Sequence, residues 1–141
     1  MRKESGMEHK VVIKGLYYGR KRTFPDLNDY LHECARHPQM GAKLKRDYQF
    51  IAQNAIRTQL PRLKIDKPII IHYRFYETDR CRDKMNIFSF ADKVFEDALQ
   101  ACKVIPNDGW DQVDNTTHDF FVDKVNPRIE IVLEEVGVSN G

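Results

Sequence analysis

The run Pro68–Tyr76, PIIIHYRFY, is the segment that most constrains how this chain folds. It opens with three isoleucines and then alternates, so that His72, Arg74 and Tyr76 share one face. An apolar run of this length, rich in β-branched residues, predicts a strand with one buried face. Charges of both signs follow immediately, over residues 77–84, where an ordinary turn would favour Gly, Asn or Pro. This loop is therefore either solvated or holds a cation near phosphates, and the segment alone leaves both readings open.

The remaining elements follow from hydrophobic periodicity and from helix start and stop signals. Either Asp26 or Asn28 can cap the first helix, and His37-Pro38 ends it. Pro61 ends the second helix. The predicted strands are 9–14, 68–76, 118–124 and 128–136, and the predicted helices are 28–36, 40–60 and 86–103. The order β-α-α-β-α-β-β predicts an α+β fold in which a small mixed sheet of about four strands packs with three helices.

The chain shows no repeats and no linker-like segment, so residues 1–141 are expected to form a single domain, with frayed tails at 1–8 and 137–141. The charged N-terminus has no apolar core of a secretory signal, and no apolar run approaches the roughly 20 residues that span a membrane. Three widely spaced cysteines without a CxxC pair predict reduced thiols, no disulfides and a cytoplasmic location.

Charge is divided unevenly along the chain. Residues 1–67 carry 15 Lys and Arg against 7 Asp and Glu, whereas residues 68–141 carry 8 against 14. The balances of +8 and −6 combine to the net +2 of the whole chain. The asymmetry is either a chance segregation on a solvated surface or a phosphate-binding face beside an acidic, metal-binding cluster.

The predicted helix 86–103 carries the residues with the clearest chemical pattern. Asn86 and Lys93 lie two turns apart on one face, and Asp97 follows four residues later. Asp83 precedes the helix and Asp108 follows it. Mg²⁺ prefers oxygen ligands and keeps several waters, so two or three such acids suffice to hold it. The alternative is structural: a helix-terminal charge at Asp83, an ion pair between Lys93 and Asp97, and a turn opened by Asp108. Trp110, close by, is predicted to be a packing anchor.

The segment Arg82–Trp110, RDKMNIFSFADKVFEDALQACKVIPNDGW, resembles the signature of the RusA-like Holliday junction resolvases, which phages and prophages often encode. That family shows an Arg-Asp-x-Asp-Asn motif after a strand, then a helix with Lys and Asp-Ala-Leu, then a turn that contains Asp. Here Arg82, Asp83 and Asn86 match the first motif. Lys93 with 97–99 matches the second, and Asp108 matches the third.

The resemblance implies a homodimer that cuts four-way DNA junctions with Mg²⁺ or Mn²⁺. It implies that Asp83 and Asp108 are catalytic metal ligands, that Lys93 is the catalytic lysine and that Asn86 orients the loop. The DNA backbone is expected to contact basic residues, because a substrate read by shape needs phosphate contacts more than base contacts. These are Arg20, Lys21, Arg22, Lys43, Lys45, Arg46, Arg57, Arg82 and Lys84.

Two departures from the family pattern bear on activity. Met85 stands where the family has its second motif acid, and a thioether is a poor ligand for Mg²⁺. The spacing from Asn86 to Lys93 is also about one helical turn longer than in better-known members. Asp97 is then the expected third metal ligand, with Asp92 and Asp79 as outside candidates.

Three functions therefore remain open. The first is a Mg²⁺-dependent endonuclease that resolves branched DNA by paired symmetric nicks. The second, motivated by Met85, is a protein of the same fold that binds nucleic acid without cutting it. The third is a protein-interaction module, which the acidic C-terminal half keeps open.

Overall fold

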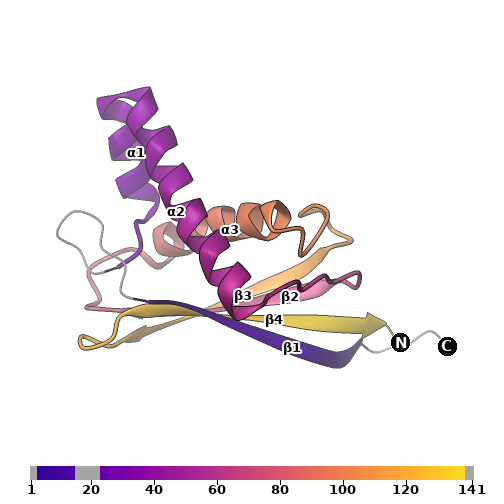
Figure 1. Cartoon of the computed structure of the whole chain (residues 1–141). Helices are drawn as coiled ribbons and strands as arrows, with labels where there is room; N and C mark the ends of the chain where they lie inside the picture. Colours follow the sequence, from indigo (N-terminus) through magenta and orange to yellow (C-terminus); the bar gives the residue numbers. More distant parts are fainter. Residues whose placement is uncertain (1–2, 15–22, 139–141) are drawn as a thin grey trace.

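The computed structural model describes residues 3–14 and 23–138, and it contains the predicted order of four strands and three helices (Figure 1). The elements are β1 (Lys3–Lys14), α1 (Leu27–Arg36), α2 (Pro38–Gln59), β2 (Ile69–Glu77), α3 (Lys84–Ala101), β3 (Val113–Val122) and β4 (Arg128–Val138). The predicted α+β class, with a four-stranded mixed sheet and three helices, is confirmed.

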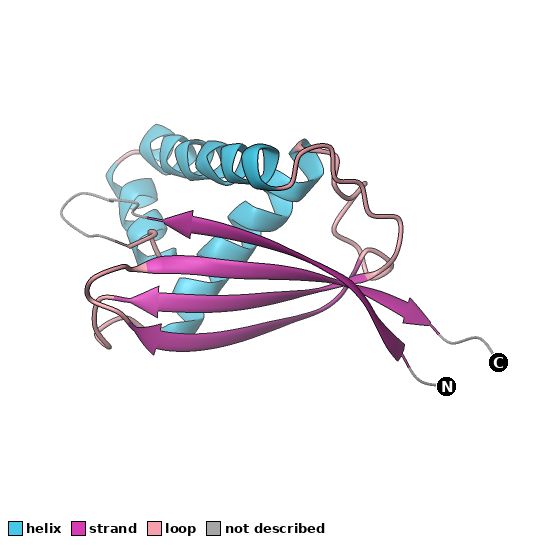
Figure 2. Ribbon diagram, turned by 60° about the horizontal axis from the view of Figure 1, so that its bottom comes forward, coloured by secondary structure: helices cyan, strands magenta, loops and turns pink. Residues whose placement is uncertain are grey.

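The sheet has the strand order β1-β4-β2-β3. β4 pairs antiparallel with both β1 and β2, whereas β2 and β3 are parallel. A parallel pair needs a crossover connection, and α3 supplies it. The helices lie on one face of the sheet and leave the other face open (Figure 2). The C-terminal ends of β2 and β3 and the beginning of α3 therefore lie at the same end of the molecule.

The core lies between the helix-covered face and the helices. In β2, alternate residues from Ile69 to Phe75 are buried, which confirms the predicted buried face. Apolar residues at three- and four-residue spacing pack onto it from two helices. They are Leu44, Tyr48, Ala52 and Ile56 from α2, and Ile87, Phe90, Ala91, Val94, Phe95, Ala98 and Leu99 from α3. α1 packs mainly on α2.

Helix boundaries follow local chemistry. Asp26, rather than Asn28, caps α1, and it forms a reciprocal capping box with Asp29. His37 ends α1 and caps α2, and Pro38 occupies the first turn of α2, where its missing N–H costs nothing. α2 ends just before Pro61.

Three strand boundaries differ from the prediction. Residues 3–8 and 137–138, expected to be frayed, are strand: Lys3 pairs with Val138, Glu4 with Gly137 and Glu8 with Glu134. β3 also begins at Val113, five residues before the predicted start. These segments are polar and show little alternation, so only their pairing with distant strands makes them extended. Residues 1–2 and 139–141 lie outside the described part of the chain.

The described structure contains neither disulfides nor a membrane-spanning helix. Cys34, Cys81 and Cys102 are free thiols, and of these Cys81 is exposed. No helix in the described ranges is long and apolar enough to cross a membrane. The stability of the domain therefore comes from its apolar core and polar networks, without disulfides.

Candidate functional site

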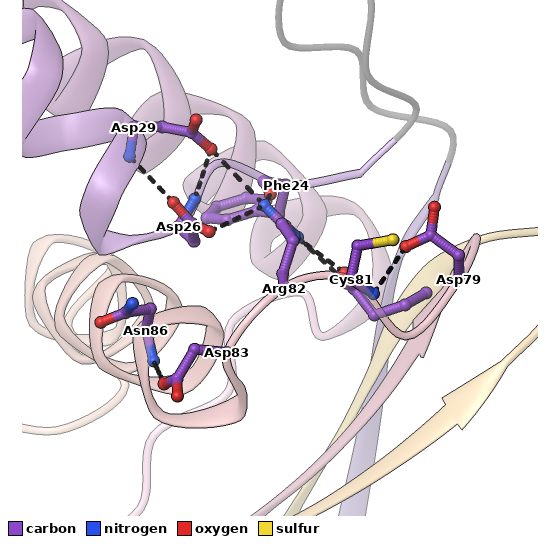
Figure 3. Close-up of polar contacts among 9 residues, drawn as sticks. Phe24, Asp26, Asp29, Asp79, Cys81, Arg82, Asp83 and Asn86 are labelled. Atoms are coloured by element: carbon purple, nitrogen blue, oxygen red, sulfur yellow. Dashed lines mark hydrogen bonds and ion pairs between the residues drawn. The ribbon is translucent and has the colours of Figure 1, made fainter.

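The loop 78–83 leads from the end of β2 into α3, and Asp83 is the N-cap of that helix. Its Oδ1 accepts a hydrogen bond from the Asn86 N–H at 3.0 Å (Figure 3). A carboxylate at the N-cap accepts a hydrogen bond from a backbone N–H that has no partner within the helix. The positive end of the helix dipole also stabilises its negative charge. Asp83 is exposed. Its carboxylate is thus held at a defined position and still faces solvent.

The side chain of Arg82, one residue earlier, points away from Asp83 and toward Glu77 and Phe24. Its Nε and Nη2 donate to the two carboxylate oxygens of Glu77, at 2.9 and 3.1 Å, and its Nη1 donates to the Phe24 carbonyl at 2.7 Å (Figure 3). The same guanidinium lies 3.8 Å from Asp26 and 3.5 Å from Asp29. The side chain is 12% exposed. Arg82 therefore ties β2, α1 and the α3 loop together, and this structural role replaces the predicted phosphate contact.

Asp83 caps the beginning of α3, whereas Asp108 lies in the loop after the helix, close enough to its C-terminal half for its charge to act on Glu96. The helix has 18 residues, so its ends are about 27 Å apart. One ion cannot bind both carboxylates at the 2.0–2.1 Å typical of Mg²⁺. Across residues 3–14 and 23–138, no three Asp, Glu, His or Cys side chains are grouped to hold a metal. The predicted set of Asp83, Asp97 and Asp108 therefore does not fit a metal ion within one protomer.

Asp97 is held between two lysines. Lys45 from α2 lies 3.3 Å from it and Lys93 lies 3.4 Å from it. This contact joins a predicted DNA-binding residue, a predicted catalytic residue and a predicted metal ligand in one ion-pair cluster. Lys93 remains 60% exposed. Asp97 is thus compensated by protein cations, whereas Lys93 can still reach an external phosphate.

Asp92 and Glu96 form a partly buried acidic pair on α3. The sequence named Asp92 only as an outside candidate for the metal and missed the pair. The Tyr73 hydroxyl, at the centre of the core, donates to Asp92 at 2.8 Å. Burial, a hydrogen bond with Asp92 and the charges of Asp92 and Asp108 raise the pKa of Glu96 to about 9. At neutral pH Glu96 is therefore protonated and donates to Asp92. The four-residue spacing of the two acids was the available signal, since it places them on one helix face.

This pair predicts a specific pH dependence of stability. Between the ordinary Glu pKa of 4.5 and the raised value of about 9, the folded chain holds a proton that the unfolded chain lacks. Stability from this site therefore falls as pH rises through that window. We expect the melting temperature of Glu96→Gln to exceed that of the wild type by a growing margin from about pH 6 to about pH 9. Thermal melts at several pH values test this, with the exposed Asp111→Asn as control; parallel profiles for all three proteins would contradict it.

The other predicted DNA-binding residues are distributed over two regions. On α2, Arg46 and Arg57 are exposed, and Lys43 pairs with Asp47 at 2.7 Å. Lys84 opens α3 and lies 5.6 Å from the Phe120 ring. It lines a cavity of about 290 Å³, together with Glu77, Asp79, Arg80, Arg82 and neighbouring apolar residues, at the C-terminal ends of β2 and β3. Arg20, Lys21 and Arg22 lie outside the described residues.

Met85 is 51% exposed in the first turn of α3, so no side-chain oxygen is available at the position of the family's second acid. No protein-family model matches the chain, and a search of curated proteins finds no significant match. The RusA-like resemblance therefore stays a prediction that rests on the motif residues themselves.

Proposed function

We propose that this protein is a metal-dependent endonuclease that resolves four-way DNA junctions by paired nicks and acts in the cytoplasm as a homodimer. One observation carries the proposal. Asp83 and Asp108 are exposed at the two ends of α3, and neither takes part in an ion pair among the described residues, while exposed Lys93 lies between them. Two carboxylates without an ion pair, on either side of a lysine that is 60% exposed beside Asp97, are available for metal and phosphate in the order that the resemblance expects.

The separation of the two acids favours a site built between protomers. β3 is an edge strand of the sheet, and the crossover helix α3 runs antiparallel to it. If two copies pair antiparallel along β3, their α3 helices run in opposite directions across the two-fold axis. Asp83 then lies at the same end as the partner subunit's Asp108. This arrangement creates two equivalent sites, one for each strand that is cut.

The direct test is gel-resolved cleavage of a labelled synthetic four-way junction in Mg²⁺, Mn²⁺ or EDTA. We expect paired, metal-dependent nicks that linear duplex does not receive and that Asp83→Asn abolishes. Asparagine caps helices as well as aspartate does, so this variant should fold normally and lose only the charge. Nicks that persist in EDTA or in Asp83→Asn would contradict the proposal.

Met85 favours a second candidate, a protein that binds junctions without cutting them. The exposed thioether provides no ligand for a hard cation, so in this candidate the metal site is incomplete even in a dimer. This candidate predicts salt-sensitive junction binding with no nicks in any metal. Met85→Asp would then be expected to introduce metal-dependent cleavage, because it restores the family's acid at the helix entrance.

A further inference from the structure

Trp110 is 96% exposed, although it was predicted to anchor the core. It is the single tryptophan of the chain, and it lies in the loop that joins α3 to β3. A fully solvated indole leaves a large apolar surface in water, which tryptophan rarely does without a partner. An exposed aromatic face is the feature on which unpaired nucleic-acid bases stack.

A basic groove lies beside this loop. It has a volume of about 770 Å³, and Pro106 and Gln112, on either side of Trp110 in sequence, line it. Lys64, Lys67 and Lys103 also line it, against one acid, Asp66. The groove therefore carries an excess of positive charge, and the loop that borders it carries an exposed aromatic ring. Together these features match what binds a nucleic-acid backbone and its bases.

The backbone gives an independent reason to assign a role to the basic side chains here. Lys103 has φ 60°, and the Lys103 and Val104 amides bond to Gln100 and Leu99, which closes α3 in a Schellman motif. Arg62, in the turn before Lys64, has φ 62° and follows Pro61. Both are positions where glycine has no steric strain. Of the two, Lys103 lines the groove, and a basic residue at a left-handed position there points to a function for its side chain.

We infer that this face binds single-stranded DNA, with a base stacked on Trp110 and the backbone phosphates on Lys64, Lys67 and Lys103. The inference rests on the proposed function for its substrate class: a strand unpaired at a branch point would supply this segment. An acidic peptide would match the lysines but would not need a solvated indole, so nucleic acid is the better occupant.

Trp110 fluorescence provides the first test. Bound oligo(dT) is expected to quench it, and rising salt should reverse the quenching, because phosphate contacts weaken with salt. By anisotropy of labelled oligo(dT), Trp110→Ala should bind about tenfold more weakly. Phe50→Ala, which removes another exposed aromatic (58%) from α2, should bind as the wild type does. Quenching by poly-glutamate but not by oligo(dT) would overturn the assignment to nucleic acid.

Lys103→Gly separates binding from folding. Glycine relieves the left-handed strain, so the melting temperature should stay the same or rise. Oligo(dT) affinity should fall, and the dependence of log affinity on log salt should decrease by about one unit. A lower melting temperature with unchanged affinity would show that Lys103 is structural and overturn the inference.

The two proposals can fail separately. If oligo(dT) binds as expected but no junction is cut, only the endonuclease proposal fails. If junctions are cut and Trp110→Ala binds oligo(dT) normally, only this inference fails.

Discussion

Arg82→Met is expected to lower the free energy of unfolding by about 3–5 kcal/mol, the usual cost of leaving a buried charge without its partner. Methionine fills similar space but leaves Glu77 and Asp26 buried without their cation, and the Phe24 carbonyl without its donor. Urea denaturation followed by circular dichroism measures the change. A loss of this size would show that Arg82 anchors the loop before α3 to β2 and to the beginning of α1.

Two variants make the result specific to this network. Arg80→Met, two residues earlier and exposed, should change stability by no more than about 0.5 kcal/mol. Arg82→Lys should fall between the two, because an ammonium keeps the charge but cannot match both Glu77 oxygens. If Arg82→Met were as stable as the wild type and lost junction binding instead, the predicted phosphate contact would stand and the structural role would be wrong.

Asp83→Asn and Asp108→Asn are each expected to reduce junction cleavage by about 100-fold or more, since a catalytic metal lowers the activation barrier by several kcal/mol. If each site combines Asp83 with the partner subunit's Asp108, a mixture of the two variants should regain activity. Random reassortment makes about half of the dimers mixed, and each mixed dimer has one intact site. Recovery of about a quarter of the wild-type sites is therefore the expected result, measured after the variants are unfolded and refolded together.

Asp97→Asn is the matched control for this experiment. Lys45 and Lys93 already neutralise Asp97, so its loss should change cleavage only a few-fold, although the sequence suggested it as a metal ligand. Each variant must also be shown to form dimers and to bind the junction. If the mixture of dimeric, junction-binding variants stays inactive, the two acids do not act across the interface, and the two-protomer site is wrong.

Most of the fold could be predicted because its signals are local. The alternation in β2 and the apolar spacing in α2 and α3 record which side of each element is buried, and Pro38 and Pro61 mark helix limits through their own backbone geometry. The element order then restricts the architecture to an α+β layer. The order of the three family motifs in the sequence likewise indicated Asp83, Lys93 and Asp108 as candidate catalytic residues.

Tertiary structure decided what those residues contact, because contacts depend on segments distant in sequence. The polar ends of β1 and β4 become strands only through their pairing with each other. The charge of Arg82 suggested DNA, but its buried carboxylate partners come from β2 and α1. The length of α3 separates two acids that motif order had grouped, and the loop after it leaves Trp110 in solvent. Sequence thus determined the elements and the chemically active side chains, while the packing of those elements determined which side chains meet, since periodicity records burial but not the identity of the neighbour.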